Sequence, residues 1–144
     1  MVPENGEPYY ETFDHTADLG IRVFGKDAVD LFAKSGTALF ELITETGSTA
    51  AEAQVTLTVS GVDWPDVMVN WLRELLYLWT GRELLVVTIE IQSLEEFRIV
   101  ADVGLVPFRP EVHPILQEVK AVTYHGLDVQ QKNGGWEATI IFDI

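Results

Sequence analysis

The sequence predicts an α+β fold in a single domain, with a mostly antiparallel or mixed sheet and two helices packed on one of its faces. Two amphipathic helical segments in the first half, alternating apolar and polar residues in the second half, and short hairpin signals support this class. A length of 144 residues suits one compact domain, and we assign residues 11–144 to it. Residues 1–10 are polar and rich in Pro and Gly, so we expect a flexible N-terminal tail.

The first half combines a strand with a helix. Residues 19–25 alternate as a strand. In the helix that follows, Asp27 is placed to cap the first turn, and Asp30 supports it three residues later. Gly47 follows the last apolar position, so we expect the helix to end there.

A second strand followed by a second helix comes next along the chain. Residues 54–60 alternate as a second strand, and the next helix has Asp63 as its cap, Pro65 in its first turn and Gly81 at its end. Each helix follows its strand through the pattern Gly-x-Asp-x-x-Asp. A duplicated strand–helix unit and independent use of the same capping chemistry both explain this pattern.

The second half is predicted to consist of strands. Residues 107–117 contain three prolines and should form an exposed irregular loop. The expected strands are residues 84–94 and 97–106, joined at Glu95-Glu96, followed by three short strands that are interrupted at Gly126 and at Asn133-Gly134-Gly135.

The charge balance is strongly acidic, with nine basic and 23 acidic residues and a formal net charge of −14. Such a surface repels phosphate backbones, so we expect no direct nucleic-acid binding, and basic proteins and divalent cations are the natural partners. The absence of cysteine excludes disulfides, thiolate nucleophiles and Cys-based zinc sites. A polar N-terminus and the lack of a long apolar run predict a cytoplasmic protein without membrane contact.

Two acidic constellations are candidates for a cation site. Asp14, His15 and Asp18 precede an apolar strand, where carboxylates could bind a hard divalent cation or simply stabilise a turn. At the other end, Asp143 is followed directly by Ile144 and its α-carboxylate, which form either a fixed anionic pair or an ordinary edge strand.

Lys120 is a third candidate. It precedes an apolar strand, where a lysine either lies at an edge or contacts a phosphate or carboxylate. No nucleophile elbow, phosphate-binding loop, EF-hand or HExxH motif accompanies these candidates.

Together, the stretches DHTADLGIRVFG, EVKAVTYHG and the final DI resemble the archease family. The stretches DLFAKSGTALFELIT and WLRELLYL resemble the two helices of that family, so the likeness extends from about residue 9 to residue 144. The resemblance implies a non-catalytic accessory protein that activates an RtcB-type RNA ligase in tRNA splicing and RNA repair. It would promote ligase guanylylation and multiple turnover.

The resemblance also implies site residues and a cofactor. A divalent cation, calcium or else manganese or magnesium, would be held by Asp18, Asp143 and the terminal carboxylate of Ile144. Lys120, His15 and Asp14 would contact the partner or its nucleotide, with Asp14 and His15 also supporting the turn.

One stretch departs from the family pattern. VGLVPFRPEVH lacks the Gly-Glu pair that many relatives have before the loop containing His113. Two other functional classes stay open at this level: a small metal-dependent hydrolase acting on phosphoesters, and a metal-free acidic module that binds proteins.

Overall fold

The computed structural model describes residues 9–15, 18–47 and 49–144. Its elements in chain order are β1 (Tyr10–His15), β2 (Asp18–Gly25), α1 (Ala28–Ile43), β3 (Ala53–Ser60), α2 (Trp64–Thr80), β4 (Leu84–Glu95), β5 (Arg98–Pro107), β6 (Ala121–Lys132) and β7 (Gly135–Asp143).

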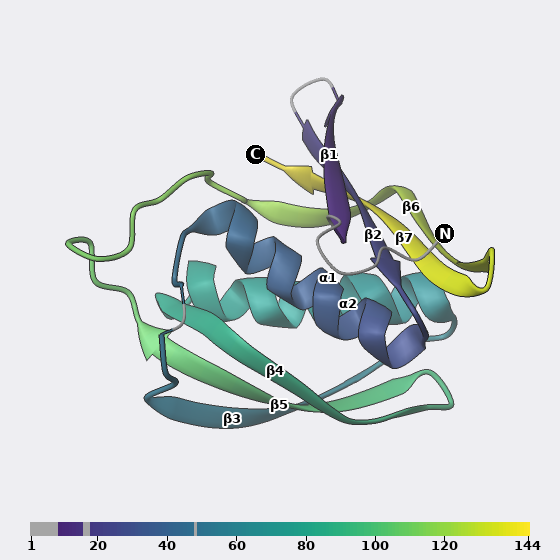
Figure 1. The fold of residues 1–144 in the computed structure, drawn as a ribbon, viewed down its shortest axis with the longest axis horizontal. Helices are drawn as coiled ribbons and strands as arrows, with labels where there is room; N and C mark the ends of the chain where they lie inside the picture. Colours follow the sequence, from purple (N-terminus) through teal and green to yellow (C-terminus); the bar gives the residue numbers. More distant parts are fainter. Residues whose placement is uncertain (1–8, 16–17, 48) are drawn as a thin grey trace.

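The two helices lie between two antiparallel sheets (Figure 1). One sheet has the strand order β1-β2-β7-β6 and the other β3-β5-β4. Both helices contact strands of both sheets, so each sheet carries the helices on one face. The predicted α+β class is confirmed, but the strands form two sheets where we expected one. The physical reason is that helices with such wide apolar surfaces need cover on two sides.

Both helices begin as the sequence predicts. At α1, the side chain of Asp27 accepts a hydrogen bond from the Asp30 amide (2.8 Å), and the side chain of Asp30 accepts one from the Lys26 amide (2.9 Å). The same pair of bonds recurs at α2, where Asp63 accepts from the Asp66 amide and Asp66 accepts from the Val62 amide. Each cap satisfies backbone donors that the first helical turn leaves unpaired.

The helix ends differ from each other. α2 ends at Thr80 with Gly81 as its C-cap, as predicted, but α1 ends at Ile43 with Thr44 as its C-cap, so the predicted stop at Gly47 is wrong. Thr44 is extended because its hydroxyl donates to the Pro114 carbonyl (2.5 Å) and its backbone forms a bridge with Ile115. A contact with a segment 70 residues away therefore ends this helix.

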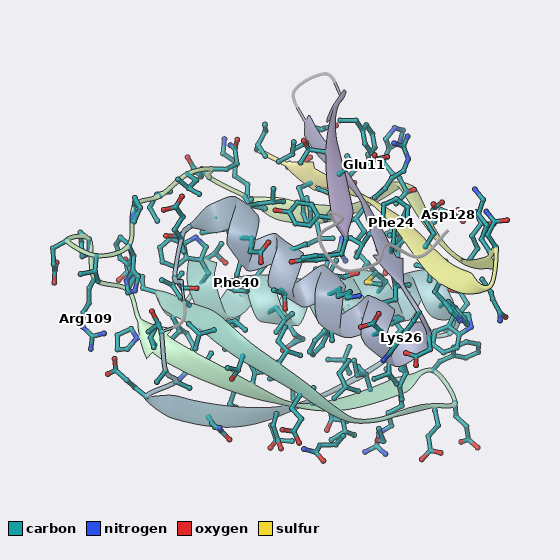
Figure 2. All side chains as sticks on the ribbon, in the orientation of Figure 1. Glu11, Phe24, Lys26, Phe40, Arg109 and Asp128 are labelled. Atoms are coloured by element: carbon teal, nitrogen blue, oxygen red, sulfur yellow. The ribbon has the colours of Figure 1, made fainter. Side chains whose placement is uncertain are left out.

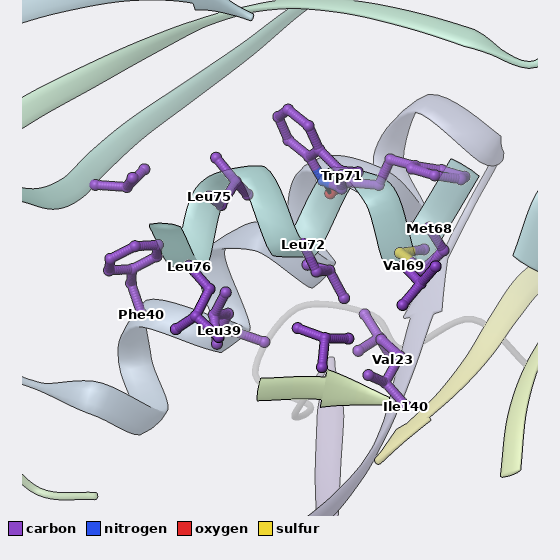
Figure 3. Packing of buried hydrophobic residues seen from close by; sticks show 14 of the residues in the cluster. Val23, Leu39, Phe40, Met68, Val69, Trp71, Leu72, Leu75, Leu76 and Ile140 are labelled. Carbon is purple, nitrogen blue, oxygen red and sulfur yellow. Dashed lines mark hydrogen bonds between the residues drawn. The ribbon is translucent and has the colours of Figure 1, made fainter. Parts of the chain in front are cut away.

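The core is centred on α2 (Figure 3). Trp71 is completely buried, and its indole N–H donates to the carbonyl of Phe32 in α1 (2.9 Å). The same buried cluster includes apolar side chains from both helices and from the four-stranded sheet, among them Leu39, Leu72, Leu75, Val23 and Ile140. Neither of the described helices combines the length and the apolar composition that crossing a bilayer requires.

The strand β1 was not predicted. Tyr10 begins it and pairs with Val23, while residues 1–8 of the expected tail lie outside the described part of the chain. Alternation is weak in YETFDH, so its strand character depends on pairing with β2.

The strands after α2 agree only in part with those expected from the sequence. The β4–β5 hairpin turns at Glu96 and Phe97, which have positive φ angles of 53° and 57°, one residue later than expected. β6 continues through Gly126 as one strand with an irregular register, so the predicted break into two strands is wrong. Gly126 has φ of 68° and allows a bulge where we expected a chain reversal.

The matched caps give a stability prediction. Asp27→Ala and Asp63→Ala should each lower the free energy of unfolding by about 1 kcal/mol, because each leaves an N-terminal backbone donor unpaired. Urea denaturation followed by circular dichroism measures this change. Asp27→Asn and Asp63→Asn keep an acceptor and should retain most of the stability. Equal losses for the Ala and Asn variants would contradict the assignment.

Candidate functional site

The pairing of β2 with β7 places Asp18 opposite Asp143. Their antiparallel register runs without a break from this pair to the pair formed by Gly25 and Trp136. Two residues that are 125 positions apart in sequence therefore become direct cross-strand neighbours.

The start of β6 joins the same sheet end. Ala121 pairs with Asp143, and the backbone N–H of Lys120 donates to the Asp143 carbonyl (2.8 Å). Asp143 is thus held between two strands, with Asp18 on one side and the Lys120–Ala121 backbone on the other. Figure 1 shows the C-terminus beside the β1–β2 hairpin and the start of β6.

The two aspartates share the outer face of this sheet. Ile140 and Phe142 are completely buried against the helix layer, and side chains alternate along a strand, so Asp143 points the other way. Its cross-strand partner Asp18 lies on the same face. Asp143 is exposed and Asp18 is half-buried.

An aromatic ring packs on this outer face at Gly20, two residues along β2 from Asp18. The Phe13 ring lies directly over Gly20, where any larger side chain would collide with it. The Arg22 guanidinium lies over that ring, 4.6 Å from its centroid, and pairs with Glu11 (2.9 Å). This packing restricts the β1–β2 hairpin and so helps to fix the position of Asp18.

Opposed carboxylates at this spacing suit a cation. Directly paired residues have Cβ atoms about 5 Å apart, and like charges there repel. Calcium takes six to eight oxygen ligands, including carboxylates, carbonyls and waters. Among the described residues, no group of three or more His, Cys, Asp or Glu side chains converges on one point. A cation bound by Asp18 and Asp143 would therefore need further oxygens from the main chain, a terminal carboxylate or water.

The predicted site residues thus gather at one sheet end to the extent that the structure describes them. Asp18, Asp143, Ile144 and Lys120 are brought together there. His15 is the backbone partner of Asp18, and Asp14 that of Leu19, but the side chains of Asp14 and His15 lie outside the described part of the structure. Metal binding by this group stays a prediction.

The sequence reasoning missed a second polar cluster close to the start of β6. The Tyr124 hydroxyl donates to Asp66 of α2 (2.7 Å), and the Arg73 guanidinium lies 4.9 Å from the Tyr124 ring centroid. Arg73 also donates to the Val122 carbonyl through two nitrogens (3.2 and 3.1 Å). These contacts tie the VKAVTYH segment to α2, and the tyrosine within that motif was the only sequence signal.

Each partner in this cluster alters the other's ionisation. The hydrogen bond from Tyr124, together with the Val62 amide, holds the pKa of Asp66 below its ordinary value. The same bond raises the pKa of Tyr124, because losing the phenolic proton would place an anion beside a carboxylate.

A helix pair enclosed between two antiparallel sheets, with opposed aspartates at one sheet end, defines a class of small α+β proteins. Residues 10–144 match the sequence profile of the Archease protein family, so the chain belongs to the archease family. Protein archease of Methanosarcina mazei is 31% identical over 147 residues, covering 99% of this chain and all of the relative. Protein archease of Methanopyrus kandleri is 31% identical over 138 residues, covering 94% of this chain and 99% of the relative.

Two solved structures share this fold. The solution structure of a Methanobacterium thermoautotrophicum protein superimposes with a TM-score of 0.75 and 26% identity, covering 94% of this chain and 99% of that one. A Thermotoga maritima archease, described as a possible chaperone, shares the fold with a TM-score of 0.64 and 16% identity, covering 93% and 96% of the two chains.

The Tyr124–Asp66 bond gives a prediction about ionisation. In Tyr124→Phe the pKa of Asp66 should rise toward its ordinary value, because the largest cause of its depression is removed. NMR titration of the Asp66 side-chain carboxyl carbon measures this pKa. Tyr77→Phe, an exposed tyrosine change on the same helix, should leave it unchanged.

The same bond links stability to pH. A carboxyl with a lowered pKa in the folded state adds stability above its unfolded pKa, and that stability is lost as pH falls through the folded value. In Tyr124→Phe this pH-dependent contribution should shrink. An Asp66 titration identical in the two proteins would show that the hydrogen bond is absent in solution.

Proposed function

We propose that this chain is a metal-binding accessory protein that activates an RtcB-type RNA ligase. The observation that carries the proposal is the placement of Asp18 directly opposite Asp143 at the sheet end where Lys120 also lies. Family membership supports the same role, because the sequence motifs that resemble archeases supply this group of residues.

The side chains of Asp18 and Asp143 would hold the cation, and the α-carboxylate of a chain ending at Ile144 would be a third ligand. Calcium is the expected ion, with manganese and magnesium as alternatives, since all three accept oxygen ligands. The bound cation would neutralise nearby phosphoryl charge. The chain's own contribution is rigidity: paired strands on both sides of β7 fix the backbone of Asp143.

Charge favours the proposed partner. A ligase that binds RNA needs a basic surface, and this chain has a formal net charge of −14. The two should attract each other over a distance, with an association that weakens as salt is added. Lys120 is exposed, and its backbone N–H is bonded to the Asp143 carbonyl; its ammonium group would contact a phosphate or a carboxylate of that partner.

Cation binding can be tested without the ligase. Calcium should raise the free energy of unfolding of the wild-type chain, by about 2.7 kcal/mol at a free concentration of 100 times Kd. Asp18→Asn and Asp143→Asn should abolish this increase. Without calcium, each variant should be equal to or more stable than wild type, by roughly 0.2–1 kcal/mol, because a repulsive pair has been removed.

Thermal and urea unfolding with calcium, manganese, magnesium or chelator measure these effects. Asp128→Asn, an exposed aspartate elsewhere on β6, is the matched control and should keep the full response. The metal assignment is wrong if wild type, Asp18→Asn and Asp128→Asn respond equally to calcium.

Ligase activation is tested by following ligase–GMP formation with purified RtcB-type ligase. Wild-type chain should accelerate guanylylation, and Asp18→Ala and Asp143→Ala should reduce the acceleration by about tenfold or more if the site acts in this step. Two glycines added after Ile144 should also reduce it, because they move the terminal carboxylate away. The same two residues added before Met1 form the control.

Acceleration by both aspartate variants at the wild-type level would disprove the role of this site. A wild-type chain that fails to accelerate the ligase would disprove the proposed function as a whole. Phosphoester turnover by the chain alone, absent in Asp18→Ala, would instead identify a hydrolase.

A further inference from the structure

The segment from Phe108 to Lys120 has little regular structure but is firmly held. Arg109 forms two hydrogen bonds with Glu52 (2.8 and 3.0 Å), and its backbone N–H donates to Nδ1 of His113 (2.9 Å). His113 is only 4% exposed. Figures 1 and 2 show this segment at the edge of the molecule, with Arg109 projecting from it.

Further contacts fix the middle and the end of the segment. The Pro114 carbonyl accepts from Thr44, the Leu116 amide donates to the Ile43 carbonyl (2.8 Å), and the Lys120 amide donates to Asp143. Because its backbone is already ordered, a partner that binds this segment loses little entropy in ordering it.

The segment exposes apolar side chains despite this anchoring. Val112, Ile115 and Leu116 are 59%, 45% and 53% exposed. Single exposed apolar residues are ordinary on protein surfaces. Ile115 differs because it forms one wall of a groove against the C-terminal end of α2.

This groove has a volume of about 530 Å³. Trp79, Ile115 and Val119 supply its apolar walls, while Glu83, Glu118 and Lys120 supply charged groups. The Trp79 ring packs edge-on against Phe108 (5.1 Å between centroids), and Phe108 stacks on His113 (6.2 Å). The Trp79 ring is therefore held in place by the Phe108 and His113 rings.

We propose that this groove binds an arginine or lysine side chain of the RNA ligase, an inference that rests on the proposed function. The apolar walls suit the aliphatic stem of such a side chain, and Trp79 can contact its cationic head. Glu83 and Glu118 are exposed carboxylates that can pair with that head, and together they outweigh the single positive charge of Lys120 in the same lining.

Continuity with the strand-end site supports the ligase as the occupant. Lys120 lines the groove, and its backbone N–H is bonded to the Asp143 carbonyl, so Lys120 connects the groove to the strand end that carries Asp143. The net charge of −14 adds a general attraction for a basic partner. A ligase that contacts Lys120 at the strand end would therefore also meet this groove.

The test is binding of purified RtcB-type ligase to the chain, measured by biolayer interferometry at low and high salt. Glu83→Lys combined with Glu118→Lys should weaken binding by about tenfold or more at low salt and reduce its salt dependence. Ile115→Ser should weaken binding without changing the salt dependence.

The matched control combines Glu95→Lys with Glu96→Lys, which changes the net charge by the same amount. These residues lie at the far end of β4 from Glu83, about 40 Å along the strand. The control should keep near wild-type binding at high salt and lose much less than the groove variant at low salt. Circular dichroism and thermal unfolding check that every variant is folded.

A second readout separates docking from activation. At saturating concentration the groove variant should still accelerate ligase guanylylation fully, because the strand-end residues are unchanged. Equal binding by wild type, the groove variant and the control overturns the groove proposal but leaves the proposed function standing. Equal weakening by the groove variant and the control also overturns it, since net charge would then explain binding.

Two other outcomes overturn the proposal differently. A wild-type chain that neither binds nor accelerates the ligase removes the proposed function and the groove's occupant together. Conversion of a wild-type dimer into a monomer by the groove variant, seen by sedimentation, would show that a second copy of this chain occupies the groove.

Discussion

The antiparallel pairing of β2 with β7 is the constraint on which the other features of the site depend. It joins the early part of the chain to its last strand and sets Asp18 opposite Asp143. A shift of one residue would turn every side chain of β2 to the other face, placing Asp18 toward the helices and Ile21 in solvent. Burial of Ile21 and Ile140, which pair with each other, therefore fixes the register that unites the two aspartates.

The two helices pack against both sheets. Trp71 is buried at the centre of that layer, and Arg73, two residues further along α2, donates hydrogen bonds to the carbonyl of Val122 in β6. Tyr124 and Asp66 add a second link between the same elements. The strand that carries Lys120 to the site is thus positioned by side chains of α2 as well as by β7.

Much of the local structure could be predicted from the sequence. The capping aspartates, the two helices and the alternation in β3 follow from chemistry within a few residues of each other, and the structure agrees. Predictions failed where contacts between distant segments determine the local structure. Thr44 ends α1 through its contact with Pro114, and β1 forms only by pairing with β2. β6 continues past Gly126 because β7 pairs with both of its halves. The Tyr124 cluster was missed for the same reason, since its members are 58 residues apart.

The sequence by itself determined the two helices and most of the strands, the acidic charge and the types of residue available for a cation or a phosphate. Family membership was also readable from short motifs at both ends of the chain. Only the tertiary structure decided that Asp18, Asp143 and Lys120 share one sheet end, and that Trp79 and Ile115 line the same groove. The reason is physical: caps and periodicity act over a few residues, whereas strand register and helix packing join segments by the apolar surface that they bury together.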